Sequence, residues 1–512
     1  LVADINIPVP NLGVMAHLDR RDVPPRGLAE AENWIFKNGA FQVRPGLATF
    51  GDNVAQRPMG YVQYRHSDGA LRTVKGTRTG LWKYNVSTNT WTNITGTALT
   101  GGPTQQIVFR VFQKAGATHL LGINEADVLQ KWDGLAAAFS AAGGSPPRAR
   151  CMAVNARHVI LGNLQSGGTI SPVGVDVSAS SDFESGWGTT QTELLADTPG
   201  DIIGMSEHGN LLTAIYKSDA IYKAVAVGAV DPFEFPLALA LDEKSGPCST
   251  LGIVKLSEGI DAYLGNDGSP RIYDGASRPV EFSPAAARWI KDNANFSALR
   301  RAFGFYDPIL KLLYFVFVEQ NKADPNLVAV IDPRNGVFHP YRYGTLRLSA
   351  GIMLNASTGL TIAELVGTLA DQELTFAEYE SIEPRIILGE IGGQSYKDSA
   401  TTDNAVAITT FWEGGLQPLG GNPRKFKTVK YIDHEFTKAA AAQAVTVKLG
   451  KSQYGEDRAL TAGKTLAVGS AGPYRTGHAK TARKISVRIE ANATQALKYR
   501  GSVAVVEERG FR

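Results

Sequence analysis

Short strands that recur at a regular spacing constrain the fold of this chain more than any other feature. Between residues 74 and 134, two hairpin patterns follow one another. In each, a short apolar run reaches a turn with Gly, Asn or Asp, and a second run with an aromatic residue ends at another polar turn. Tyr84 and Trp132 occupy equivalent places 48 positions apart. Similar units recur at residues 220–223, 271–275 and 328–333.

The spacing of these units, roughly 45 to 58 residues, is the length of a four-stranded blade rather than of a helical repeat. It predicts a mainly β protein with a six- or seven-bladed β-propeller. The approximate blades are expected at residues 56–100, 101–150, 151–200, 201–247, 248–295 and 296–343. Because closing such a ring usually requires strands from both ends of the chain, a segment beyond residue 380 is expected to pair near the start.

The two ends of the chain follow other patterns. In the N-terminal arm, residues 1–55, prolines prevent long regular elements, and residues 28–36 predict either a short helix or an extended segment. Residues 344–384 form an insertion in which apolar positions between Ile362 and Leu369 follow helical spacing. That helix would be a surface insertion or a subunit interface. Residues 385–512 alternate apolar and polar side chains, which predicts the propeller closure and an antiparallel β domain.

Individual segments allow more local predictions. Residues 310–318 are nearly all apolar and give the clearest prediction of a buried strand, whereas residues 288–296 predict a short helix on a loop. Cys151 and Cys248 are almost a hundred positions apart and are interpreted as buried free thiols. The chain begins with Leu1 rather than Met, so we expect that a few leading residues were either removed or left out of the numbering.

Charge is distributed unevenly along the chain. Residues 413–512 carry 18 Lys and Arg against 8 Asp and Glu, whereas residues 1–412 carry 34 against 41. This asymmetry favours an anionic partner for the C-terminal part, such as DNA or an acidic subunit, and leaves an ordinary solvated strand face as the alternative. The candidate basic patch for a channel or subunit interface consists of Arg475, Lys480, Arg483, Lys484, Arg488, Lys498 and Arg500.

No catalytic or cofactor-binding signature is present in the sequence. It lacks a Gly-x-Ser-x-Gly elbow, a Walker loop and the spacings of zinc ligands, so we expect no enzyme activity, no cofactor and no metal. A propeller glycosidase would need paired carboxylates. The acidic candidates lie beside turn residues, where a carboxylate usually binds local backbone: Asp127, Asp133, Asp267, Asp274 and Asp332. No apolar run of 18 residues predicts a membrane span, and the first residues lack the features of a signal peptide.

Residues 27–46, with the sequence GLAEAENWIFKNGAFQVRPG, resemble the opening of the tail hub, or nozzle, proteins of short-tailed bacteriophages. In that family an Asn-containing segment, a Gly turn and an Arg-Pro-Gly precede a β-propeller. Residues 76–84, 90–92, 130–134 and 178–187 also fit the blade pattern of the family, and the resemblance covers most of residues 20–415.

The resemblance implies a structural protein of the virion tail, made in the cytoplasm of the host bacterium. It would form a homohexameric ring below the portal and adaptor proteins, next to tail fibres or spikes. Such a ring continues the DNA channel with non-specific contacts to double-stranded DNA, retains the packaged genome and conducts it at ejection. The residues alone leave two alternatives, namely a carbohydrate-binding or carbohydrate-cleaving propeller and a cellular interaction scaffold.

Overall fold

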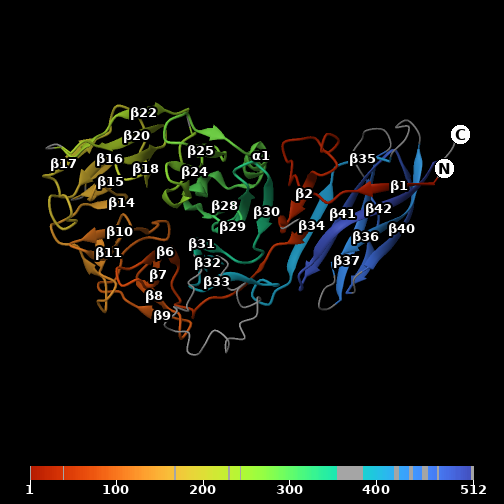
Figure 1. Cartoon of the computed structure of the whole chain (residues 1–512), viewed down its shortest axis with the longest axis horizontal. Coiled ribbons are helices and arrows are strands. Elements are labelled where there is room, and N and C mark those ends of the chain that lie inside the picture. Colours follow the sequence, from red (N-terminus) through yellow and green to blue (C-terminus); the bar gives the residue numbers. More distant parts are fainter. Residues whose placement is uncertain are drawn as a thin grey trace, which may run out of the picture.

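The computed structural model describes residues 2–37, 40–166, 169–228, 231–242, 244–354, 385–419, 426–437, 442–452, 459–469 and 472–508. The protein is mainly β and is built from small antiparallel sheets. Seven of these sheets are arranged around a common centre, and two larger sheets lie beside them (Figure 1). We call these two parts the seven-sheet unit and the sandwich.

The seven-sheet unit follows the order of the chain. Its first three sheets are β6–β9 (Pro58–Arg65, Leu71–Thr77, Leu81–Asn85, Thr90–Asn93), β10–β13 (Val108–Lys114, Ala117–Ile123, Gln130–Trp132, Ser140–Ala141) and β14–β17 (Arg148–Asn155, His158–Ser166, Thr169–Val177, Gln191–Leu194). The next three are β18–β22 (Ile202–Glu207, Leu212–Lys217, Ala220–Ala226, Phe233–Glu234, Leu237–Ala240), β23–β26 (Ile253–Ser257, Ile260–Leu264, Pro270–Tyr273, Val280–Glu281) and β27–β30 (Phe303–Asp307, Leu312–Val318, Pro325–Ile331, Phe338–Arg342). Five of these six sheets fall within the units predicted from the spacing of the strands, and the third begins three residues before its predicted start, at Arg148.

The seventh sheet joins the two ends of the chain. It contains β31 (Leu348–Leu354), β32 (Arg385–Glu390), β33 (Ser395–Ala400) and β5 (Gly46–Thr49), and β33 pairs antiparallel with β5. A segment beyond residue 380 therefore does pair near the start. The predicted insertion at residues 344–384 contains β31, whereas its predicted helix lies outside the described residues.

Contacts between the sheets form a cycle. The first strands β6, β10, β14, β18, β23, β27 and β31 each contact the next, and β31 contacts β6. Most neighbouring sheets also bury an apolar cluster of their own, as where Trp91 of the first sheet packs with Phe50 and Ile387 beside the seventh. The strands approach closely enough that a Cβ on Gly60 of β6 would lie 2.3 Å from the carbonyl oxygen of Ile107. Only glycine fits there without displacing backbone.

The sandwich is built from both ends of the chain. Sheet A has the order β3 (Trp34–Lys37), β4 (Ala40–Val43), β42 (Lys498–Glu508), β36 (Lys427–Phe436), β40 (Gly472–Ala482), and β1 (Val2–Ile7) pairs with β42. Sheet B has the order β2 (Leu28–Glu32), β34 (Ile408–Gly414), β41 (Lys484–Ala493), β37 (Gln443–Ser452), β38 (Ala459–Leu460), with β35 (Gln417–Pro418) beside β41 and β39 (Lys464–Val468) beside β37. Residues 28–36 are thus extended, one of the two alternatives that the sequence allowed.

A single core connects the two parts. Trp34, Phe41, Trp412 and Tyr499 are less than 2% exposed and pack ring against ring between sheets A and B, with centroids 5.0–5.9 Å apart. The same apolar cluster includes Phe315 of β28 in the sixth sheet. Burial of this continuous apolar surface holds the sandwich against the seven-sheet unit.

The local predictions are confirmed. Strand β28 is buried along nearly its whole length, as expected for residues 310–318. The short helix is α1 (Pro284–Asn293), whose first turn is capped by the Ser283 side chain accepting from the backbone N–H of Ala286. Cys151 and Cys248 are both buried free thiols.

Candidate functional site

The predicted basic residues lie on two different sheets and do not form one patch. Sheet A carries Arg475 and Lys480 on β40 and Lys498 and Arg500 on β42, whereas Lys484 and Arg488 lie on β41 of sheet B. Arg483 connects β40 to β41 and stacks over Phe426 at 4.7 Å. Strand alternation predicts which side chains share a face of one strand, but it does not tell which sheet that strand joins. We call Arg475, Lys480, Lys498 and Arg500 the sheet A cations.

Carboxylates of the same chain surround Arg488. Its Nη1 lies 3.2 Å from Glu30 and 3.5 Å from Glu413, and its Nε donates to Glu490 at 2.7 Å. Arg20 also pairs with Glu30 and Glu413. Arg488 is thus already paired within its own subunit, and its role at a channel or subunit interface stays a prediction.

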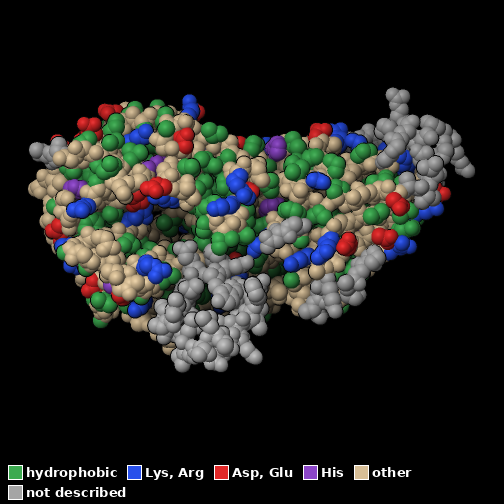
Figure 2. Space-filling model, in the orientation of Figure 1, with side chains coloured by type: hydrophobic (Ala, Val, Ile, Leu, Met, Phe, Trp, Pro, Cys, Tyr) green, Lys and Arg blue, Asp and Glu red, His purple; other side chains and the backbone are tan. Residues whose placement is uncertain are grey.

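The sheet A cations are exposed and differ in their partners. Arg475 forms a two-pronged pair with Asp433, with nitrogen–oxygen distances of 2.7 and 2.9 Å, and lies 3.8 Å from the centre of the Tyr431 ring. The hydrogen bond from Arg475 lowers the pKa of Asp433. Lys480 and Lys498 have no carboxylate partner among the described residues. Figure 2 shows basic and acidic side chains mixed over the visible face of the sandwich.

Side chains cross the centre of the seven-sheet unit. Gln106, just before β10, donates from Nε2 to the carbonyl oxygen of Ala302 at 3.0 Å and accepts from the backbone N–H of Leu251 at 3.1 Å. It thereby connects the second sheet to the segments preceding β27 and β23. Arg110 of β10 reaches Glu207 of β18 with an Nε–Oε1 distance of 2.7 Å. These cross-links tie the first strands together where they converge.

The five acidic candidates serve turns and loops. Four of them accept hydrogen bonds from backbone N–H groups two or three residues further on, as the turn interpretation predicts: Asp133, Asp267, Asp274 and Asp332. Asp127 instead accepts from the backbone N–H of Thr100 at 2.8 Å and joins two loops.

A buried polar cluster between the fourth and fifth sheets has no signal in the sequence. Asp261 is fully buried. Its Oδ1 accepts from the hydroxyl of Ser206 at 2.8 Å, and its Oδ2 accepts from the hydroxyl of Tyr216 at 2.7 Å and lies 2.7 Å from His208 Nε2. In a catalytic triad the serine hydroxyl donates to the imidazole, and the imidazole donates to the carboxylate. Here the hydroxyl of Ser206 donates directly to the carboxylate, so these residues are not arranged as a triad. The cluster links β18, β19 and β24, with His208 directly after β18.

A second buried network predicts how acid affects the sandwich. His434 is fully buried, contacts Ser502 Oγ at 2.7 Å and Thr476 Oγ1 at 2.9 Å, and burial lowers its pKa to about 3. An unfolded histidine titrates near pH 6.5. Because the folded pKa is lower, the stabilising contribution of neutral His434 is complete above pH 6.5 and is lost as the pH falls towards 3.

Replacement of His434 by Gln tests this coupling. At pH 7, we expect it to lower the free energy of unfolding by about 1–3 kcal/mol, because two buried hydrogen bonds are disturbed. That cost should shrink by about 1.4 kcal/mol for each pH unit below 6. Urea unfolding of both proteins between pH 7 and 4.5 measures it. A cost that stays constant with pH would show that His434 does not titrate on unfolding.

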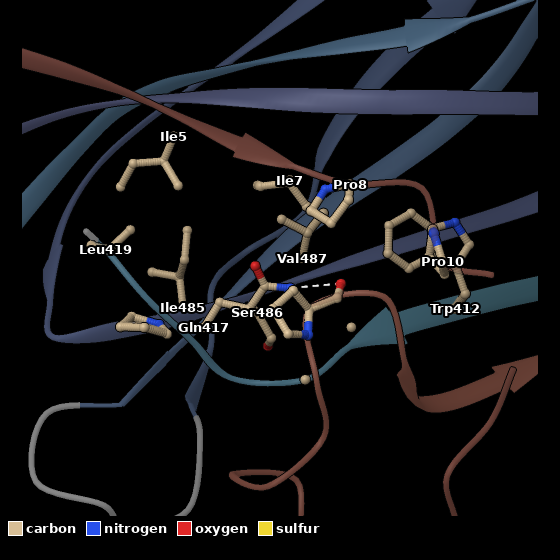
Figure 3. Close-up of a pocket in the computed structure, with 14 residues that line it drawn as sticks. Ile5, Ile7, Pro8, Pro10, Trp412, Gln417, Leu419, Ile485, Ser486 and Val487 are labelled. Carbon is tan, nitrogen blue, oxygen red and sulfur yellow. Dashed lines mark hydrogen bonds between the residues drawn. The ribbon is translucent and has the colours of Figure 1, made fainter. Parts of the chain in front are cut away.

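The N-terminal arm covers a small cavity at one end of the sandwich (Figure 3). Its apolar lining includes Ile5, Ile7, Trp412, Ile485 and Val487. Gln417 Nε2 donates to the carbonyl oxygen of Pro25 at 3.0 Å and holds the arm in place. No charged side chain lines this cavity. We therefore interpret it as the place where the N-terminal arm packs against the sandwich, rather than as a binding site for a polar ligand.

Neither a metal centre nor a membrane helix occurs in the described part of the chain. No group of three or more His, Cys, Asp or Glu side chains there is placed to hold a metal ion. Among the same residues, no helix is long and apolar enough to cross a membrane. Comparison with models of protein families and with curated proteins finds no match to this chain.

Proposed function

We propose that this chain is a structural subunit of the tail nozzle, or hub, of a short-tailed bacteriophage. The observation that carries the proposal concerns residues 27–46, on which the resemblance rests. They supply β2 to sheet B, β3 and β4 to sheet A and the start of β5 to the seventh sheet. Because this segment contributes strands to both sheets of the sandwich and to the seventh sheet, most substitutions in it would disturb several parts of the fold. We therefore expect its sequence pattern to be retained in a family even where the rest of the sequence has diverged.

The buried contacts of this segment support its joining role. Asn33 adopts a φ of 63°, and its side chain accepts from Arg44 Nε at 2.9 Å and donates to the carbonyl oxygen of Thr409 at 2.8 Å. It also accepts from the backbone N–H of Arg342 at the end of β30. Asparagine tolerates this left-handed conformation better than most residues. Asn33 therefore connects sheet B, the sixth sheet and the start of β5.

A seven-bladed β-propeller is the architecture that we propose for the seven-sheet unit. Three features support it: the sheets have four or five strands each, their first strands contact one another in a cycle, and β5 from near the start completes the last sheet. Propellers of this kind leave only short edges exposed and are rigid. A rigid propeller that shares a core with the sandwich would be a suitable subunit for a ring.

DNA would pass between copies of this chain rather than through one copy. The Gln106 and Arg110 cross-links obstruct the centre of the seven-sheet unit, so a duplex cannot use it. A homohexameric ring below the portal and adaptor proteins would instead enclose the channel. Head-to-tail contacts form a closed ring when the rotation from one subunit to the next adds up to a full turn. In this account the protein is not an enzyme; it retains the packaged genome, conducts it at ejection and adjoins the tail fibres or spikes.

The composition of purified particles tests this function. In nuclease-treated, gradient-purified particles of the virus that encodes the chain, we expect about six copies for each particle, because the proposed ring is six-fold. Quantitative mass spectrometry against the major capsid protein gives this number. Absence of the chain from the particles would contradict a virion role.

A further inference from the structure

A groove rich in acidic side chains lies where the outer strands of the third and fourth sheets meet, at β17 and β21. It has a volume of about 540 Å³ and carries the carboxylates of Glu193, Asp197, Asp231 and Glu234, together with Leu194, which is 59% exposed. No Lys or Arg lines it, and none of these carboxylates forms an ion pair among the described residues, while the charge of Lys217, behind Tyr222, interacts with that of Asp197. We call it the rim groove.

The rim groove combines negative charge with apolar surface. The rings of Tyr222, Phe233 and Phe235 also line it beneath the carboxylates. Isolated exposed leucines are common, but a leucine within a hollow lined by aromatic rings and carboxylates has the composition of an interface. The matching surface would present cations whose long aliphatic stems can cover the apolar part.

This chain carries such a surface at its other end. The sheet A cations lie on strands at one end of the long axis of the molecule, and β17 lies at the opposite end (Figure 1). Next to them, Val503 is 38% exposed on β42. The distribution of charge agrees, since residues 413–512 are strongly basic and the rest of the chain is acidic overall. DNA would be repelled by the rim groove, whereas a second copy offers the complementary charge.

We infer that the rim groove of one copy receives the sheet A face of the next copy. This inference rests on the proposed ring and names the two surfaces that form each of its contacts. Complementary patches at opposite ends of one subunit produce a head-to-tail contact, which uses two different surfaces and allows a closed ring. Association should therefore weaken as the salt concentration rises, because exposed ion pairs are screened.

Charge reversal on both surfaces tests the inference. The rim variant combines Glu193→Lys, Asp197→Lys and Glu234→Lys, and the sandwich variant combines Lys480→Glu, Lys498→Glu and Arg500→Glu. Each variant alone should associate on the order of 100-fold more weakly than the unmodified chain, because several attractions become repulsions. An equal mixture should assemble again, since every contact in an alternating ring then has opposite charges. Native mass spectrometry and sedimentation velocity of the full chain measure both results.

The possible results distinguish an error in the inferred surfaces from an error in the proposed ring. A control with Glu258→Lys and Glu281→Lys, exposed on the fifth sheet, should assemble like the unmodified chain. If the unmodified chain forms rings and both reversed variants do so equally well, the inferred surfaces are wrong and the ring stands. If the unmodified chain stays monomeric at every concentration, both the ring and its surfaces are contradicted. Circular dichroism of each variant shows whether it has folded.

Discussion

Replacement of Arg44 by Met is expected to lower the free energy of unfolding by about 3–5 kcal/mol, since it leaves a largely buried carboxylate without its partner. The Arg44 side chain is fully buried, and its guanidinium donates to both oxygens of Asp403, at 2.9 and 2.5 Å. It also lies 4.1 Å from the centre of the Tyr343 ring. Urea unfolding followed by tryptophan fluorescence gives the change.

Arg475 is a matched control for Arg44. It also binds both oxygens of an aspartate, Asp433, and lies over a tyrosine ring, but its side chain is 60% exposed. We expect Arg475→Met to cost less than about 1 kcal/mol, because water screens an exposed pair. Equal effects of the two substitutions would contradict the role of Arg44 in joining the N-terminal arm to the rest of the fold.

Replacement of Lys75 by Met is expected to remove a dependence of stability on alkaline pH. Lys75 is fully buried between the first and seventh sheets, 4.2 Å from the centre of the Trp91 ring. Its ammonium has distant partners, Ser395 Oγ at 3.3 Å and the carbonyl oxygen of Gly393 at 3.4 Å. Burial lowers the pKa of Lys75 to about 7, against 10.5 when it is exposed.

The sign of the effect follows from these pKa values. Between pH 7 and 10.5 the unfolded chain binds a proton at Lys75 that the folded protein does not, so stability increases with pH over this range. We expect the free energy of unfolding to rise by about 1 kcal/mol per pH unit from pH 7 to 8.5. Above that range, Cys151 and Cys248 act in the opposite direction, because burial raises the pKa of each thiol to about 12.

The Lys75→Met protein should lose this rise and should be more stable than the original protein at pH 7. Lys83 provides the control, since it lies over the Trp132 ring at 5.8 Å but is only half-buried. Lys83→Met should leave the pH dependence as it was. Urea unfolding at several pH values measures all three proteins, and a slope that survives in Lys75→Met would show that another group titrates.

Local pattern was enough to predict the six sheets between residues 56 and 343. Their strands are consecutive in the chain, and most of the turns carry Gly, Asn or Asp near the strand ends. The seventh sheet was not predicted as a unit, because its strands come from residues 46–49 and 348–400 and no local signal connects them. For the same reason the sequence could not show that residues 28–43 belong to the sandwich.

The roles of the charged side chains could be interpreted only from the tertiary structure. The cationic strand at residues 484–490 resembles a free basic face, yet the carboxylates of Glu30 and Glu413 that neutralise Arg488 are more than 70 positions away. The rim groove was missed because its carboxylates lie on separate outer strands and loops that only the fold brings together. The buried Asp261 cluster likewise depends on pairing between two sheets.

Electron cryomicroscopy of intact particles of the short-tailed bacteriophage that we propose as the source of this chain tests the nozzle proposal most directly. We expect six copies of the chain in a ring around the DNA below the portal and adaptor. The basic sandwich of each copy should contact the rim groove of the next. A tail reconstruction in which every ring below the portal is built from other proteins would contradict it.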